Sequence, residues 1–131
     1  MASIQSINVS LRILGDDLDP EGVSALLGME PTHGRRKGDA VDGDALPAAT
    51  GAWILESSLP ETAEIEEHVS QLLAPLSGDL DEWGTVTTNF SADMRCDLTL
   101  GNGSEAFDLS PRLAQSLAER GIVISFHITG S

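Results

Sequence analysis

Three of the chain's seven basic residues lie together between two glycines in segment 34–38, as Arg35, Arg36 and Lys37. Backbone amides and guanidinium groups that converge in such a loop bind carboxylate or phosphate groups. Trp53, an aromatic residue of the next expected strand, is placed to stack on one of these cations. The pattern indicates a receptor site for a small anion at these four residues. The alternative is that the cations pair with carboxylates nearby.

Acidic residues dominate the rest of the chain, because 21 Asp and Glu stand against 7 Lys and Arg, which gives a net charge of −14. Such a charge repels nucleic acid and anionic membranes and attracts basic proteins. Glu61, Glu64 and Glu67 cluster where a helix is expected to begin. We expect them to engage a basic partner, as an immunity protein or an inhibitor does. A solvated helix surface or adaptation to salt is the alternative.

No sequence pattern predicts a catalytic centre, a metal site or a cofactor site. His33 lies near several aspartates, but the spacing matches no known ligand pattern. His68 lies among glutamates and is expected to be exposed, and His127 to lie on the polar face of the last strand. Cys96 alternates in phase with the apolar residues Met94 and Leu98, so we expect it to lie in the core, which argues against a reactive thiolate. No phosphate-binding glycine motif or nucleophile elbow is present, so we expect a non-enzymatic protein.

The first half of the chain predicts two strands and two helices. Alternating apolar residues predict a strand over 7–13 and another over 52–57. Asp19 as N-cap, Pro20 and then Gly28 delimit a short helix between these strands. A longer helix is expected to begin at the turn 58–61 and to end near Pro75.

The second half predicts a hairpin, a helix and a final strand. Apolar residues at every even position favour a long strand over 86–100, after at most one helical turn at 79–83. An Asn-Gly turn at 101–103 then predicts an antiparallel return strand over 104–109. The last helix is expected between the N-cap Ser110 and Gly121, and the last strand over 122–128.

These elements define one expected α+β domain over residues 1–131. Strands that alternate apolar and polar residues favour an antiparallel or mixed sheet with helices on one face. We therefore expect a two-layer sandwich, with a ferredoxin-like arrangement as one candidate. An unpaired edge strand in such a sheet would support a homo-oligomer.

Other features of the sequence indicate a cytoplasmic protein that does not enter a membrane. Cys96 is the only cysteine, which excludes an internal disulfide and fits a reducing compartment. We find neither the pattern of a signal peptide nor an apolar run of about 18 residues.

Six segments form a familiar pattern in their order along the chain: Leu18–Pro20, Leu26–Thr32, Arg36–Asp39, Gly51–Ser57, Phe107–Pro111 and Leu117–Ile122. Together they resemble the bacterial domain-of-unknown-function family 4279. The resemblance covers nearly the whole chain and departs from the family in the polar stretch 84–91 and in heavier acidity. It implies a small, stand-alone bacterial α+β protein of unassigned role. It implies no catalytic residue.

Overall fold

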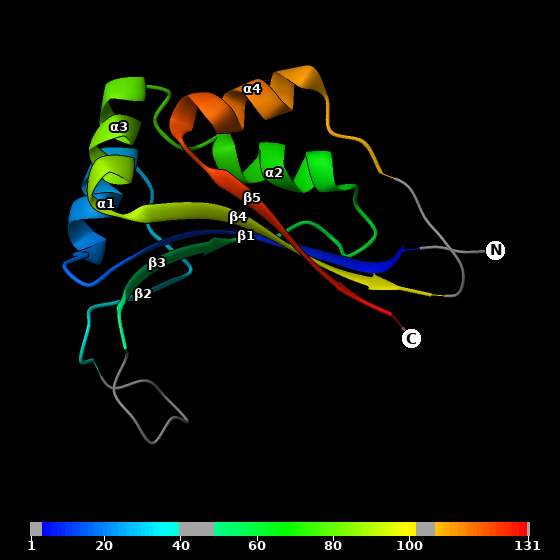
Figure 1. Cartoon of the computed structure of the whole chain (residues 1–131), viewed down its shortest axis with the longest axis horizontal. Helices are drawn as coiled ribbons and strands as arrows, with labels where there is room; N and C mark the ends of the chain where they lie inside the picture. Colours follow the sequence, from blue (N-terminus) through cyan, green and yellow to red (C-terminus); the bar gives the residue numbers. More distant parts are fainter. Residues whose placement is uncertain (1–3, 40–48, 102–106, 131) are drawn as a thin grey trace.

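The computed structural model describes residues 4–39, 49–101 and 107–130. One five-stranded sheet and four helices make up this described part (Figure 1). In chain order the elements are β1 (Ile4–Gly15), α1 (Pro20–Leu27), β2 (His33–Arg35), β3 (Gly51–Glu56), α2 (Ile65–Leu73), α3 (Leu80–Asn89), β4 (Ser91–Leu100), α4 (Pro111–Arg120) and β5 (Val123–Thr129).

The sheet is mixed and has the strand order β2-β3-β1-β4-β5. β1 runs antiparallel to both β3 and β4, and β2 runs antiparallel to β3. β5 runs parallel to β4, with α4 as the crossover between them. Strands β1 to β4 have the order and directions of the β-α-β-β-α-β ferredoxin-like fold, but two helices, α2 and α3, connect β3 to β4, and α4 and β5 are added after β4. The predicted α+β fold with a mixed sheet is confirmed.

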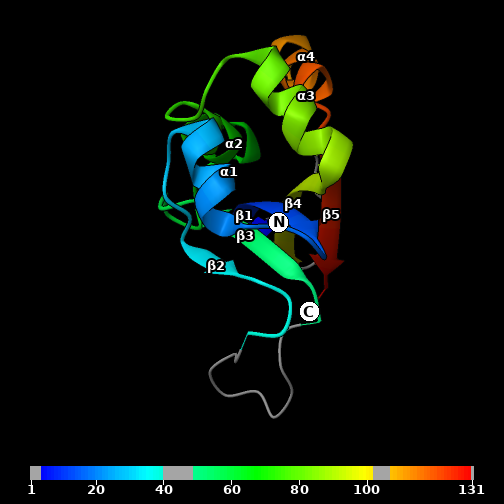
Figure 2. The same ribbon diagram turned by 90° about the vertical axis from the view of Figure 1, so that its left-hand side faces the viewer.

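All four helices lie on one side of the sheet, as the two perpendicular views show (Figures 1 and 2). On β1, Ile7, Val9, Leu11 and Ile13 are buried in the core, while Asn8 is exposed on the opposite face. β4 alternates in the same way, so the core fills the space between the sheet and the helices. Within the described residues, no helix has the length and apolar character that a membrane span requires.

α1 and α4 begin and end where the sequence predicts. The side chains of Asp19 and Ser110 accept hydrogen bonds from backbone N–H groups in the first turns of α1 and α4, at 3.2 and 3.1 Å. Each helix has proline at its first position. Gly28 and Gly121 end them in the left-handed conformation, with φ of 76° and 74°, which favours glycine.

The predicted strand over residues 86–100 is wrong in its first part, because α3 continues to Asn89 and β4 begins only at Ser91. Trp83 and Val86, three residues apart, are both buried on one side of this helix. The Thr87 hydroxyl donates to the Trp83 carbonyl at 3.0 Å, which satisfies a β-branched polar residue inside the helix. Valine and threonines at alternate positions therefore imitated the period of a strand.

The predicted hairpin after β4 is also wrong where the structure tests it. Residues 102–106, which include most of the expected turn, lie outside the described residues, and residues 107–109 form no strand. The place beside β4 is taken by β5, which arrives in the parallel direction after α4. Phe107 packs 5.3 Å from Phe126 of β5, measured between ring centroids.

Two smaller differences concern the start of α2 and the basic loop. α2 begins at Ile65 and not directly at the predicted turn 58–61, because a further turn precedes it, in which the Ala63 N–H donates to the Pro60 carbonyl at 3.0 Å. The basic loop contains the short strand β2, which pairs with β3 and which the sequence pattern did not reveal.

β5 forms one edge of the sheet in the described part of the chain. Its Val123 and Ile128 side chains are exposed, and the sequence of the strand carries no acidic residue. An apolar edge strand of this kind can pair with another strand. The homo-oligomer expected from an unpaired edge stays a prediction, with β5 as its candidate contact.

Candidate binding groove

The two exposed cations of the basic loop are held by carboxylates of the loop before α1. Arg36 Nη2 lies 2.7 Å from Asp19 Oδ1, and Lys37 Nζ lies 3.4 Å from Asp16 Oδ2. The hydrogen bond to Asp19 raises the pKa of Arg36, while the Thr50 hydroxyl and then Lys37 lower the pKa of Asp16. These contacts are the internal pairing that the sequence offered as the alternative to an anion site.

Trp53 lies away from the basic loop cations. Its side chain is 0% exposed in the core, and its Nε1–H donates to Ser24 Oγ of α1 at 3.0 Å. Arg35 stands opposite Ala52, the neighbour of Trp53, and therefore points to the other face of the sheet. The structure thus does not bring Trp53 together with Arg35, Arg36 and Lys37 in one pocket.

Two of the three predicted partner-binding glutamates line one cavity. Glu64 and Glu67 are exposed at the start of α2 and border a space of about 710 Å³. Glu66 and Asp108 also line this cavity, and none of its lining residues is basic. Glu61 is exposed but does not line it; its carbonyl accepts a hydrogen bond from Ile7 N–H at 3.0 Å.

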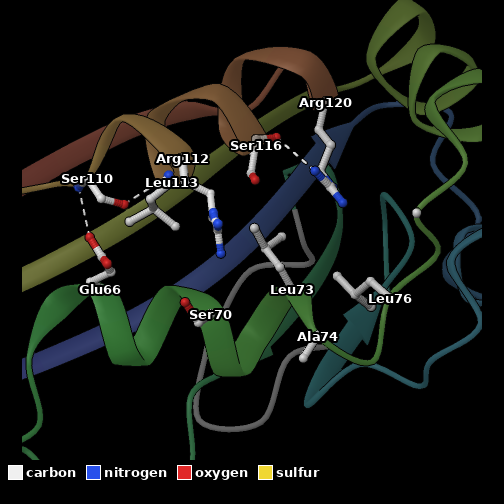
Figure 3. Close-up of a pocket in the computed structure, with 11 residues that line it drawn as sticks. Glu66, Ser70, Leu73, Ala74, Leu76, Ser110, Arg112, Leu113, Ser116 and Arg120 are labelled. Carbon is white, nitrogen blue, oxygen red and sulfur yellow. Dashed lines mark hydrogen bonds between the residues drawn. The ribbon is translucent and has the colours of Figure 1, made fainter.

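One hydrogen bond joins the starts of α2 and α4. Glu66 Oε1 accepts from the backbone N–H of Ser110 at 2.8 Å, and the Ser110 hydroxyl caps α4 (Figure 3). The bond occupies one carboxylate oxygen and fixes the distance between the two helices at this end. Both helices therefore present their N-terminal turns to the acidic cavity.

A second cavity, of about 390 Å³, continues between the same two helices and shares Glu66, Ser70 and Ser110 with the first. We call the two cavities together the α2–α4 groove. Figure 3 shows Arg112 reaching from α4 toward α2, with Arg120 further along the same helix. The first cavity, where all charged lining residues are acidic, is the acidic end of the groove, and the second, which both arginines line, is its basic end.

Arg120 is held firmly within this groove. Its Nη1 donates to the Ser116 carbonyl at 3.0 Å, and its guanidinium carbon lies 6.0 Å from the centroid of the Trp83 ring. Its Nε is buried and has no hydrogen-bond partner among the described residues. The guanidinium group thus has a fixed position and unused donor capacity.

His68 is buried, which contradicts the exposure expected from its glutamate neighbours. His68 is 1% exposed, and its Nδ1 lies 2.7 Å from Ser57 Oγ. Burial lowers the pKa of His68. Both residues border a small polar cavity of about 240 Å³, which Glu56 and Asp97 also line. Within the described ranges, no group of three or more His, Cys, Asp or Glu is arranged to hold a metal ion.

Sequence reasoning missed the basic end of the groove, although a signal for it exists. Arg112, Ser116 and Arg120 are spaced by four residues, which places them on one face of a helix. Glu66 and Ser70 have the same spacing on α2. Recognising that these two faces meet requires the relative placement of the helices, which no single segment encodes.

The fold and this groove define a small α+β protein with two adjoining cavities between two helices. The family model of DUF4279, a domain of unknown function, matches residues 5–131, so the chain belongs to this family. The resemblance found in the sequence is thereby confirmed. No curated protein and no solved structure matches the chain.

Proposed function

We propose that the protein is a non-catalytic binding module that engages a basic protein partner through the acidic end of the α2–α4 groove. The observation that carries the proposal is the cavity bordered by Glu64, Glu66, Glu67 and Asp108 without a basic lining residue. None of these four carboxylates forms an ion pair with a cation among the described residues. They are therefore available to lysine or arginine side chains of another protein.

The lining of this cavity also suits the long side chains of basic residues. Leu109 and Pro111 provide apolar surface beside the carboxylates. Lysine and arginine can cover such surface with their aliphatic stems while the charged head meets an acidic group. The net charge of −14 adds long-range attraction, which speeds association at low salt and weakens as salt rises.

The proposal is tested by the binding of lysine- and arginine-containing peptides to the Glu64→Gln, Glu67→Gln double variant. An exposed ion pair contributes about 0.2–1 kcal/mol, so the loss of two lowers the affinity by about 2- to 30-fold. The matched control is the Asp17→Asn, Glu30→Gln variant, which loses the same charge at exposed sites outside the groove. Equal losses in both variants would show that only the overall charge matters, and would refute the groove.

The alternative function is a receptor for a small anion at the basic loop. One observation favours it: Arg35 Nε is buried and has no hydrogen-bond partner in the described part of the chain. Arg36 and Lys37, however, are already paired with Asp19 and Asp16. Stabilisation by an anion that is lost in Arg35→Gln, measured by thermal unfolding, would support this function over the first.

A further inference from the structure

The basic end of the α2–α4 groove holds two cations that have no acidic partner among the described residues. Within the described part of the chain, four of the seven Lys and Arg side chains form ion pairs with carboxylates: Arg12 with Asp93, Arg36 with Asp19, Lys37 with Asp16 and Arg95 with Asp97. Arg112 and Arg120 form none with the described residues, although acidic residues outnumber basic ones threefold in this chain. Both line the same cavity, so their positive charge is directed to a common space.

The two arginines are positioned from one helix and approach the cavity from above α2 (Figure 3). Arg120 is oriented by the Ser116 carbonyl and by the Trp83 ring, and its buried Nε has no partner among the described residues. Arg112 is exposed and extends into the gap between the helices. A guanidinium group that is already oriented loses little freedom when it binds a planar or tetrahedral oxyanion.

Apart from Glu66, the remaining lining of this cavity is apolar or carries hydroxyl groups. Leu76 and Leu113 are buried, and Leu73 is half-buried beside them. The cavity of about 390 Å³ has the size of a site for a small molecule. The aliphatic chain of a ligand that packs against these leucines would be removed from water, which is favourable. A charged group at the end of that chain would contact the arginines.

We propose that this end of the groove binds a small oxyanion carried by an aliphatic chain, such as a carboxylate or a phosphate monoester. Arg112 and Arg120 hold the charged group, and Leu73, Leu76 and Leu113 contact the chain. Glu66 also lines the cavity, and one of its carboxylate oxygens accepts the Ser110 N–H. Arg112 and Arg120 do not line the acidic cavity, and Glu64 and Glu67 do not line this one, so either proposal can fail without the other.

The ligand class is tested by isothermal titration of the full chain with five probes. Hexanoate and hexyl phosphate carry both features, acetate and inorganic phosphate carry only the charge, and hexanol carries only the aliphatic chain. We expect binding of hexanoate or hexyl phosphate, or of both, and at least tenfold weaker binding of the other three probes. Their comparison identifies the preferred oxyanion. Equal binding of acetate and hexanoate, or binding of none of the probes, would overturn the proposal.

The position of the site is tested with Arg112→Gln, an exposed substitution that removes one guanidinium group. We expect the affinity for the best probe to fall about tenfold or more. The control is Arg95→Gln, which removes an arginine of β4 that does not line the groove and leaves the affinity unchanged. Chemical shifts of the Ser70 and Ser116 amides in the unmodified protein provide a second measurement. If the probe moves neither amide, or if Arg95→Gln weakens binding as much as Arg112→Gln does, the site is not in the groove.

Discussion

Ser57 Oγ and His68 Nδ1 lie 2.7 Å apart and join the end of β3 to the buried side of α2. The same oxygen accepts the Leu59 N–H at 3.2 Å, while Nε2 of the buried ring has no hydrogen-bond partner among the described residues. Burial lowers the pKa of His68, and the carbonyl groups of Pro60 and Ala63 oppose this shift. The native protein therefore favours the uncharged imidazole.

This pair predicts that the free energy of unfolding falls in mild acid. Because the pKa of His68 is lower in the folded protein than its ordinary value of about 6.5, the unfolded chain binds the proton more readily. The stabilisation is fully present above about pH 6.5 and is lost as the pH falls toward the lowered pKa. Urea unfolding at a series of pH values between about 8 and 5 measures this slope.

The control for this slope is His127→Gln, which removes an exposed histidine and leaves the pH dependence unchanged. His68→Gln lowers stability at every pH and flattens the slope below about pH 6.5. An identical slope in the unmodified protein and in His68→Gln would assign the acid sensitivity to the carboxylates instead.

A second prediction concerns the buried hydrogen bond from Trp53 Nε1 to Ser24 Oγ. Ser24→Ala leaves the indole N–H without its acceptor in the core, and we expect a loss of about 1–3 kcal/mol in the free energy of unfolding. Ser58→Ala is the control, because Ser58 accepts an exposed bond from Gln71, and its loss changes stability by about 0.5 kcal/mol or less. Similar losses in the two variants, measured in urea, would contradict the role given to this bond.

A third prediction concerns Gly51, where β3 approaches β1 and the turn before α1. A Cβ atom at this position would lie 2.7 Å from the Gly15 carbonyl oxygen and 3.0 Å from Leu18 Cβ. We expect Gly51→Ala to cost about 1–3 kcal/mol, because backbone must shift to admit the methyl group. Gly78→Ala is the control, since nothing lies within 4 Å of its added Cβ. Thermal unfolding that ranks the two variants equally would refute the contact.

A fourth prediction concerns Cys96, which is fully buried on β4. Burial, with smaller effects of Asp97 and Asp93, raises the pKa of its thiol to about 12. We expect an aromatic disulfide reagent to label the native protein only as fast as the core opens, and to label the Gly51→Ala variant faster. Labelling of the native protein at the rate of a free thiol would show that Cys96 is accessible.

The sequence predicted those elements whose limits are set by local chemistry. Asp19 and Gly28 delimit α1, and Ser110 and Gly121 delimit α4, through caps that depend on neighbouring residues alone. The burial of Cys96 followed from strict alternation along β4. These features can be predicted from the sequence because a helix cap or the alternation of a strand involves only a few consecutive residues.

The features that the sequence did not predict depend on contacts between distant segments. His68 was expected to be exposed because glutamates lie beside it in the sequence. It lies instead on the buried side of α2, where it contacts Ser57 at the end of β3. The sequence positions of Arg112 and Arg120 predict no site. The two side chains form a candidate site because α4 lies along α2 and both line the cavity between these helices. The segment around Thr87 was expected to be a strand but is helical, and the Thr87 hydroxyl donates a hydrogen bond to the Trp83 carbonyl in the preceding helical turn.

The strand added beyond β4 has a consequence for how the α2–α4 groove opens. One wall of the groove, α2, belongs to the ferredoxin-like portion, whereas the other, α4, belongs to the C-terminal pair α4–β5 that attaches beside β4. Detachment of that pair as a cooperative unit dismantles the groove while the four remaining strands stay paired. A ligand bound in the groove therefore stabilises the attachment of α4–β5 to the other elements. We expect it to slow amide hydrogen exchange in α4 and β5 more than in β1.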